Sequence, residues 1–472
     1  MDMGTTGVGR VLESTEPMKM ARQFMRETYE TPKGRQGLWR VLGSWWVWGK
    51  GKWGVVEDEV VETTLWRWLE DMSYQVATGV VRLGADRKTV GDVYAALVAL
   101  TLTPRRDFPC WVGREGPEPG SCIAFEDVVV SVQGGKVEVV ERDEDWMDLV
   151  VLPCKWEPEA KAERWHRALG EWGQGDGKWG ELLQWWMGYM LMSKRGYAKW
   201  LLMQGKTRGG KGVIAQVQRA LVGRGAWSDV SQMDLASDFA LEGMEWARVI
   251  NIPEVAKGDE VEKQGSNRVM KSVLGEDPQT VNGKYQRRKR GVVIRAVIQM
   301  SANMIPVMPN EGEGISSKML VLPFVRSFKL NPQHDLKEVL MGELAGIAAW
   351  AVEGARKLEE GKGNGWPEPE AAKDVVLRFR LQNNELDGFL EARCRKDPEG
   401  FVEGEILWRE WEDYVRENKV RVWMPRNQFL VKVEEESTWD LKRGRRRVGE
   451  QNRRGMFGLA LRKREEGEGD QV

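Results

Sequence analysis

Hydrophobic and polar positions along the chain follow either a helical or a strand-like periodicity, and the arrangement of the two differs between regions. Over residues 1–155, helical spacing as in ETTLWRWLEDM is mixed with strand-like alternation as in AFEDVVVSVQGGKVEVVE, where Gly134-Gly135 is typical of a hairpin turn. Over 156–360, helical segments alternate with the apolar runs LLMQ, RVINIPE, VVIRAVIQMSA and MLVLPF. That alternation is typical of a largely parallel sheet covered by helices. The pattern therefore predicts a multidomain α/β protein.

The last part of the chain has a different character. GKGNGWPEPEAA, residues 361–372, is predicted to be a linker. Beyond it, over 373–472, Trp408, Trp411 and Val415 form an apolar helical stripe, and Pro425 is predicted to start a second helix. KRGRRR and NRRGMFGLALRKR follow, and they are predicted to form a basic wing. Such a domain favours DNA binding, with a simple solubilising tail as the alternative.

Composition narrows the class of protein. A chain of 472 residues is too long for one core and predicts two to four domains. With 30% charged and 41% hydrophobic residues and a net charge of -1, the chain is typical of globular proteins. No apolar run is long enough to cross a bilayer, and no signal-peptide core is visible, so we expect a cytoplasmic protein without a membrane partner. Four scattered cysteines and two histidines exclude zinc-finger spacing, and no metal-ligating cluster or disulfide framework is predicted.

The stretch LLMQGKTRGGKGVI, residues 201–214, has the spacing of a phosphate loop between a strand and a helix. Backbone N–H groups at such a helix start face an anion. Gly212, however, stands where the Mg²⁺-binding hydroxyl is usual. We predict ATP and Mg²⁺ as cofactors, with water or a neighbouring hydroxyl on the metal, and a tight turn without a ligand as the alternative. The predicted nucleotide-binding residues are Gly205, Lys206, Thr207, Arg208, Gly209, Gly210, Lys211, Gly212 and Val213.

Two later strand ends carry candidate catalytic groups. RVINIPE ends in Glu254, which would position and polarise the attacking water, and VIRAVIQMSAN ends in Asn303, whose amide would orient that water or sense the γ phosphate. Loop, carboxylate and amide at successive strand ends are expected to converge on one crevice. Taken singly, each residue is as consistent with an ordinary strand end.

At this point the sequence resembles the phage and plasmid primase-helicases, whose ATPase core belongs to helicase superfamily three. The segments MEWARVINIPEVAKG, VMKSVLGEDPQTVNGKY, VVIRAVIQMSANMIP and SSKMLVLPFVRSF follow the order of the family's acidic strand, basic loop, sensor asparagine and arginine-finger segment. The resemblance implies an AAA+ (P-loop) ATPase core over 156–360, with a helical collar at about 156–197. It also implies an α+β N-terminal domain over 1–155 and a winged-helix domain with a basic tail over 373–472.

The sequence departs from the family in two places. Many members have a hydroxyl where this chain has Val213, which puts the direct protein ligand to Mg²⁺ in doubt. Lys318 stands at the arginine-finger position, from which the family's residue reaches the ATP of a neighbouring subunit. Lysine keeps the charge but loses the planar fork, so Arg295 and Arg326 are candidates to share the role.

Two basic clusters are predicted to hold the DNA backbone with little sequence preference. The resemblance places the first on a loop that points into the central channel of a ring; a solvated surface run is the alternative. The predicted DNA-binding residues are Lys284, Tyr285, Arg287, Arg288, Lys289 and Arg290 of the loop, and Arg445, Arg446 and Arg447 of the tail.

Two other clusters are given structural interpretations. The tryptophans between Trp39 and Trp53 are predicted to pack in a core and a hairpin rather than to stack on bases. Asp143-Glu144-Asp145 is predicted to be an acidic surface turn. Primase activity is therefore not expected in this chain.

These observations predict an ATP-dependent replicative DNA helicase of a phage or mobile element. We expect it to form a homo-hexameric ring that translocates on single-stranded and forked DNA, with a separate primase or polymerase as a further candidate partner. The alternative is a nucleotide-gated DNA-binding or initiator ring with weak or no ATP hydrolysis. A purely structural nucleic-acid-binding protein is disfavoured by the ordered motifs.

Overall fold

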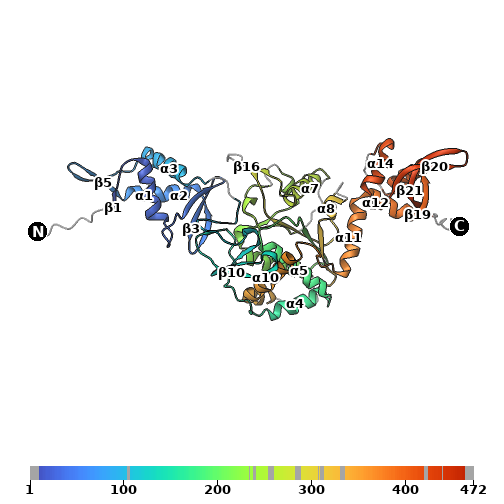
Figure 1. The fold of residues 1–472 in the computed structure, drawn as a ribbon, viewed down its shortest axis with the longest axis horizontal. Coiled ribbons are helices and arrows are strands. Elements are labelled where there is room, and N and C mark those ends of the chain that lie inside the picture. The colour runs from blue at the N-terminus through green and yellow to red at the C-terminus, as the bar shows by residue number, and fades with distance from the viewer. Residues whose placement is uncertain are drawn as a thin grey trace.

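Three bodies of the protein follow one another along its longest axis (Figure 1). The computed structural model describes residues 10–103, 107–232, 234–237, 241–253, 260–281, 289–306, 308, 313–329, 335–418, 424–437 and 439–462. Within these ranges, no helix combines the length and apolar character needed to cross a bilayer.

The N-terminal body contains two small sheets and three helices. Its elements are β1 (Arg10–Leu12), α1 (Pro17–Tyr29), β2 (Leu38–Val41), β3 (Ser44–Gly49), β4 (Lys52–Val56), α2 (Asp58–Glu70), β5 (Met72–Val76), β6 (Gly79–Arg82) and α3 (Arg87–Thr101). Strands β2, β3 and β4 form an antiparallel meander, and β5 pairs with both β1 and β6. Trp45, Trp46 and Trp53 are at most 3% exposed, which confirms that these tryptophans serve packing.

Residues 107–155 form a second layer of short strands. They are β7 (Cys110–Trp111), β8 (Cys122–Ala124), β9 (Val128–Ser131), β10 (Glu138–Glu141) and β11 (Trp146–Met147). The predicted hairpin is present as the antiparallel pair β9–β10, and both Gly134 and Gly135 have positive φ in its connection. Ile123, Phe125 and Val130 pack into the core of the central body. This layer is therefore joined by packing to the central body.

The acidic triplet of this layer is buried, so its interpretation as a surface turn was wrong. Asp143 is 9%, Glu144 6% and Asp145 2% exposed. Asp143 accepts a hydrogen bond from Lys33 Nζ at 2.6 Å, and Glu144 accepts one from Thr31 Oγ1 at 2.8 Å. Burial alone would raise the pKa of Asp143, but the bond from Lys33 and its other partners hold that pKa below its ordinary value. The triplet fastens the N-terminal body to the second layer.

The central body is built on a five-stranded sheet with the order β13-β14-β17-β12-β18. Every neighbouring pair in it is parallel. Its strands are β12 (Trp200–Gly205), β13 (Trp227–Asp229), β14 (Val249–Ile252), β17 (Val297–Ala302) and β18 (Met319–Phe324). All residues of β14, β17 and β18 are buried, as expected for parallel strands covered on both faces. The predicted α/β class with a parallel sheet is confirmed.

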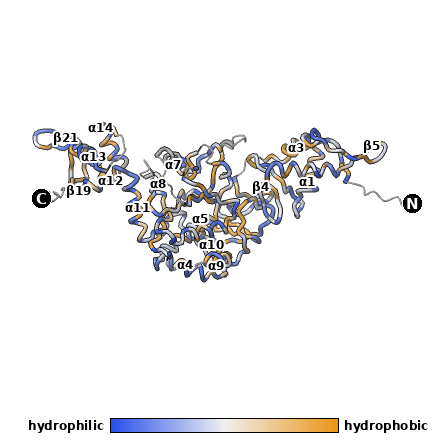
Figure 2. Tube along the Cα trace, turned by 180° about the vertical axis from the view of Figure 1, so that it is seen from behind, coloured by the Kyte–Doolittle hydropathy of each residue, from blue (hydrophilic) through white to orange (hydrophobic). Residues whose placement is uncertain are grey.

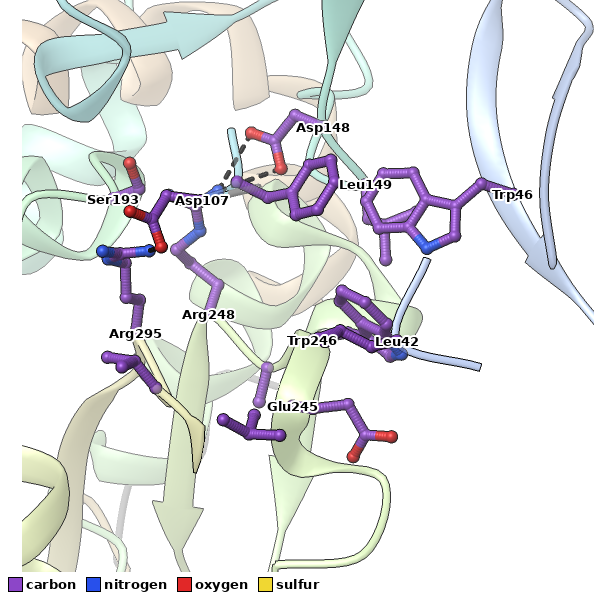
Figure 3. Close-up of a pocket in the computed structure, with 14 residues that line it drawn as sticks. Leu42, Trp46, Asp107, Asp148, Leu149, Ser193, Glu245, Trp246, Arg248 and Arg295 are labelled. Carbon is purple, nitrogen blue, oxygen red and sulfur yellow. Dashed lines mark hydrogen bonds and ion pairs between the residues drawn. The ribbon is translucent and has the colours of Figure 1, made fainter. Parts of the chain in front are cut away.

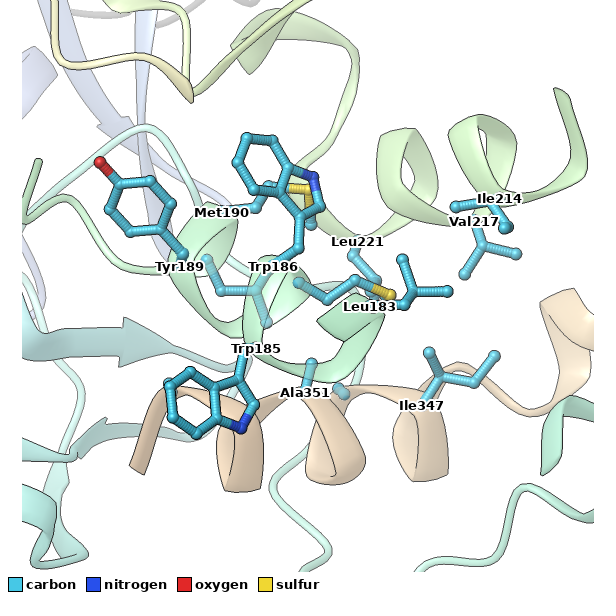
Figure 4. Close-up of a cluster of buried hydrophobic side chains, with 14 of the residues drawn as sticks. Leu183, Trp185, Trp186, Tyr189, Met190, Ile214, Val217, Leu221, Ile347 and Ala351 are labelled. Carbon is cyan, nitrogen blue, oxygen red and sulfur yellow. The ribbon is translucent and has the colours of Figure 1, made fainter. Parts of the chain in front are cut away.

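Helices cover both faces of this sheet. They are α4 (Glu163–Gly173), α5 (Gly177–Leu191), α6 (Lys211–Val222), α7 (Glu260–Leu274), α8 (Glu313–Ser316), α9 (Leu336–Gly342) and α10 (Leu344–Glu360), and a hairpin of β15 (Gln279–Val281) and β16 (Lys289–Val292) follows α7. On one face α5, α6 and α10 pack together (Figure 4). Helices α5 and α10 approach closely, because a Cβ on Gly188 would lie 2.2 Å from the Ala355 backbone nitrogen.

The C-terminal body has a core of its own that begins at Leu386. Its elements are α12 (Glu385–Arg393), β19 (Cys394–Glu403), α13 (Gly404–Asn418), α14 (Arg426–Glu436), β20 (Lys442–Val448) and β21 (Gln451–Leu461). Helix α11 (Glu370–Asn383) precedes it, and Ala372, Val375 and Phe379 pack into the core on the second face of the central sheet. By packing, the central body therefore extends through α11, which begins inside the predicted linker at 361–372 and continues into the region predicted for the C-terminal domain. The helix expected after Pro425 and the basic hairpin are both present as α14 and β20–β21.

Candidate nucleotide site

The turn between β12 and α6 has a backbone that only glycine fits at two positions. Gly205 has φ +141° and Gly210 φ +115°. A Cβ on Gly205 would lie 2.1 Å from the Phe324 carbonyl oxygen, and one on Gly210 would lie 2.5 Å from Trp172 Nε1. The close approach of the Phe324 backbone to Gly205, and of the Trp172 ring to Gly210, explains why glycines are needed here. It also leaves an N–H-rich turn at the start of α6, the arrangement that binds anions.

The segment after β18 holds this turn in place. The Lys206 N–H donates to the Phe324 carbonyl at 2.9 Å, Ser327 Oγ donates to the Thr207 carbonyl at 2.8 Å, and the Phe328 N–H donates to the Arg208 carbonyl at 3.0 Å. Arg208 itself has φ +59°, an unfavourable conformation for a non-glycine residue. These bonds fix the shape of the turn without a ligand.

Lys211 and Asn303, predicted from separate strand ends, are in contact. Lys211 Nζ donates to Asn303 Oδ1 at 3.1 Å and to the carbonyls of Gly205 at 2.7 Å and Lys206 at 3.0 Å. Burial lowers the pKa of Lys211. In the described part of the chain, no carboxylate pairs with this ammonium. Its partners are neutral oxygens, which leaves its charge uncompensated in a half-buried position.

The neighbouring strands explain this convergence. β17 lies between β12 and β14, and all three are parallel, so their carboxyl ends share one edge of the sheet. Asn303 directly follows β17, and the loop follows β12. Glu254 would come after β14 at the same edge, but it lies outside the described residues.

The structure separates the three cations that were candidates for the finger role. Arg326 lies beside the loop, where it lines a hollow with Lys206 and Ser327. Lys318 directly precedes β18, and its carbonyl accepts from the Trp200 N–H at the amino end of β12. The six paired residues from Trp200 to Gly205 separate this edge from the loop by about 20 Å, at about 3.3 Å per residue. Arg295 lies at that far edge as well, paired with Asp107 at 3.1 Å and Glu276 at 3.8 Å.

The position of the missing hydroxyl is sterically open. A Cβ on Gly212 would meet nothing within 4 Å. Val213 is partly buried against the core that α5 and α6 share. Two hydroxyl groups are associated with the loop. Thr207 belongs to the turn itself, and Ser327 is hydrogen-bonded to the turn.

Of the predicted channel loop, only the end can be placed. Lys284, Tyr285, Arg287 and Arg288 lie outside the described residues. Lys289 and Arg290 begin β16, which pairs antiparallel with β15.

The basic hairpin of the C-terminal body brings arginines face to face. In the β20–β21 register, Arg445 pairs with Arg454, and Arg446 with Arg453. All four are exposed. Like charges directly opposite each other destabilise a strand pair, so the hairpin concentrates positive charge at an energetic cost. Figure 2 shows the hydrophilic tip of this hairpin projecting from the body. The sequence placed Arg453 and Arg454 in the predicted basic wing but not among its DNA-binding residues, and the turn at 449–450 sets them opposite those residues.

The amino edge of the sheet carries a second hollow, which the sequence did not predict (Figure 3). Arg248 Nη2 donates to both oxygens of Asp148, at 2.9 and 3.1 Å. Burial raises the pKa of Asp148, against the influence of Arg248. Trp46 stacks on Phe108 with ring centroids 4.8 Å apart, and Trp246 packs edge-on against Trp46. This seam joins the N-terminal body to the strands that lead to the candidate site.

Comparison with known proteins gives little beyond this geometry. No family model matches the sequence, and no curated protein matches it. Three structures of the NrS-1 C-terminal region are similar to it. The A form apo structure of residues 305–718 is 14% identical, with a TM-score of 0.49, over 90% of this chain and 87% of that chain. A second A form apo structure is 12% identical, with a TM-score of 0.45, over 89% and 96%; an apo structure of 305–718 is 12% identical, with a TM-score of 0.44, over 94% and 100%.

Proposed function

We propose that this protein is an ATP-dependent DNA helicase that acts in the replication of a phage or other mobile genetic element. The observation that carries the proposal is the contact of Lys211 with Asn303 beside a glycine-dependent turn at the start of α6. Two residues 92 positions apart meet at the edge where a parallel α/β sheet binds its ligands. Asn303 is exposed at this edge, and Lys211 begins α6 there in a half-buried position.

The residues present fit the triphosphate of ATP. The turn from Gly205 to Gly210 offers backbone N–H groups, and its shape depends on glycines, because a Cβ at Gly205 would meet Phe324 and one at Gly210 would meet Trp172. Lys211 would exchange its neutral oxygens for phosphate oxygens, and the released Asn303 amide would orient a water. Glu254 is proposed to polarise that water. Mg²⁺ would supply charge neutralisation on the phosphates, with Thr207 or Ser327 as the nearest hydroxyl on offer.

The position of Lys318 supports a ring with sites between subunits. A side chain about 20 Å along the strand from its own loop cannot reach a nucleotide bound there. At the opposite edge it would be available to a neighbouring copy. We propose a homo-hexamer with an AAA+ core of the superfamily-three type, in which Lys318 acts in trans and Arg326 in cis.

The two basic regions support single-stranded and forked DNA as the partner. The paired arginines of β20–β21 form a compact positive ribbon in a winged-helix-like domain, and polyphosphate is the partner that relieves their mutual repulsion. The 284–290 segment is proposed to follow DNA through the ring. A separate primase or polymerase would supply synthesis.

One observation favours a second candidate, a nucleotide-gated DNA-binding or initiator ring. Gly212 places no hydroxyl at the Mg²⁺ position, although the space for one is open. Such a ring would bind ATP and assemble on DNA with little turnover.

Steady-state ATP hydrolysis, measured with and without single-stranded DNA, tests the proposal. Wild type is compared with Lys211→Ala and Glu254→Gln. DNA-stimulated turnover that both variants lose supports the helicase. Tight ATP binding without turnover favours the gated ring, and absence of ATP binding rejects both.

A further inference from the structure

A network of buried amides crosses the central sheet beneath the loop. Gln299, in the middle of β17, donates from Nε2 to Gln218 Oε1 of α6 at 2.9 Å and to Asn251 Oδ1 of β14 at 3.0 Å. Its Oε1 accepts from Trp186 Nε1 of α5 at 3.1 Å. All four side chains are at most 3% exposed. One side chain thus joins two strands and two helices.

These amides are unusual in their surroundings. The strands around them consist almost entirely of buried apolar residues, and the backbone ladder already fixes the pairing of Asn251 with Gln299. Burying an amide costs about 1–3 kcal/mol unless its hydrogen bonds are made. An apolar residue at either position would satisfy packing without that risk. The network therefore serves something other than sheet formation.

The network is connected to each candidate catalytic element. Gln299 lies four residues before Asn303, Asn251 lies three before Glu254, and Gln218 lies two helical turns after Lys211 on α6. Beyond Asn251, the bonds continue from its Nδ2 to Asp229 Oδ1 at 2.8 Å, at the end of β13. A shift of one strand or of α6 along its axis would break bonds of Gln299, so the network fixes the three elements against one another.

We propose that Gln299, with Asn251 and Gln218, is a positioning residue that sets the spacing of the phosphate-binding lysine, the carboxyl end of β14 and the sensor asparagine. This inference rests on the proposed ATPase function. Gln299 itself touches no substrate; it acts by holding β14, β17 and α6 in one register.

The test is Gln299→Leu, which nearly keeps the side-chain volume and removes all three bonds. Hydrolysis (kcat) is expected to fall about 10- to 100-fold, because displacements near 1 Å have that effect on catalysis. Nucleotide affinity is expected to change less than about threefold, because the turn and Lys211 remain. Asn251→Leu combined with Gln299→Leu should lower kcat little further, since residues that act as a unit are not additive.

Gln23→Leu is the matched control. Gln23 is a 3% exposed amide of α1 that bonds to the backbone at residues 11 and 13 and to Glu27. Both glutamine variants should lower the thermal midpoint, but only Gln299→Leu should lower kcat. If Gln299→Leu does not fold, Gln218→Leu, which breaks one bond of the network, replaces it with the same expectation.

The outcomes separate the two proposals. The positioning role is overturned if Gln299→Leu or Gln218→Leu lowers the thermal midpoint but keeps the wild-type kcat. The ATPase proposal survives that result as long as Lys211→Ala abolishes turnover. If wild type turns over no faster than Lys211→Ala, the ATPase function fails and the positioning role fails with it.

Discussion

The two edges of the central sheet differ in what they are built to contact. At the carboxyl edge, the turn after β12 is held by three hydrogen bonds to residues 324–328, and Lys211 reaches Asn303 across the sheet. At the amino edge, Arg248 and Arg295 are engaged with acids of residues 107–155, and aromatic rings close the seam. The polar groups at the carboxyl edge surround the proposed ligand site, whereas those at the amino edge contact other parts of the protein. Cations that look alike in sequence therefore have different partners, depending on the edge at which they lie.

Mixing two inactive variants tests this assignment most strongly. Lys211→Ala and Lys318→Ala are each expected to lose ATP hydrolysis by about 100-fold or more, because each removes charge stabilisation from the site. If Lys318 acts in trans, an equal mixture of the two restores about a quarter of wild-type activity. That fraction is the share of random interfaces in which both lysines are intact.

The matched control is a mixture of Lys211→Ala with Arg326→Ala. Arg326 lies beside the loop of its own subunit, so the damage falls on the same site from which Lys211 acts. Every subunit in this mixture lacks either Lys211 or Arg326 in its own site. No site is therefore intact, and no activity should return. If ATP hydrolysis recovers in this control, or does not recover when Lys211→Ala is mixed with Lys318→Ala, the proposed difference between the two edges is wrong.

The structural task of the amino edge predicts a large stability effect. Arg248→Met leaves Asp148 buried without its partner and is expected to cost about 3–5 kcal/mol in the free energy of unfolding. Arg295→Met, at the same edge, should cost less than about 1 kcal/mol, because its partner Asp107 is exposed. Chemical denaturation of both variants gives the comparison. Equal losses would show that the seam does not depend on the buried pair.

How far the sequence predicts this molecule depends on the range of the signal. Apolar runs between helical segments predicted the parallel sheet, because strands buried on both faces carry that pattern in their own residues. The spacing of Gly205 and Gly210 likewise predicted the turn from neighbouring residues alone. The contact of Lys211 with Asn303 was predicted because the carboxyl ends of parallel strands share one edge.

Contacts set by distant packing could not be predicted in this way. Asp143-Glu144-Asp145 has the local composition of a surface turn, and only its pairing with residues 31–35 and Arg114 explains its burial. Lys318 lies at the amino edge because it precedes β18, which runs parallel to β12. The residue type alone does not show this. Gln299 is one polar residue within an apolar run, and its bonding depends on Gln218 and Asn251, which only the fold brings beside it.

The arginine hairpin of β20 and β21, which belongs to neither edge of the central sheet, predicts an effect of intermediate size. Arg445→Ala with Arg454→Ala is expected to weaken single-stranded DNA binding and to reduce the slope of log K against log salt by about 1.4, at about 0.7 per lost phosphate contact. Nucleotide affinity should not change, since the hairpin belongs to a separate core. Fluorescence anisotropy over a salt series measures both quantities.

The control for the hairpin changes the same number of charges in the same body. Arg409→Ala with Arg416→Ala removes two exposed arginines of α13 that pair along their own helix. An equal loss of slope in this variant would mean that the body attracts DNA by charge alone, and the facing arginines would have no special role.

The smallest expected effect concerns the open position at the carboxyl edge. Gly212→Ser places a hydroxyl where a Cβ meets nothing within 4 Å, so the substitution should be tolerated. We expect half-maximal hydrolysis at a several-fold lower Mg²⁺ concentration, because a direct ligand replaces a water. Gly212→Ala is the control, because it also replaces the glycine at the start of α6 but adds no ligand. If serine and alanine behave alike, the metal does not approach this position. Val213→Thr then becomes decisive, because an increase there alone would put the Mg²⁺ ligand one residue further along α6.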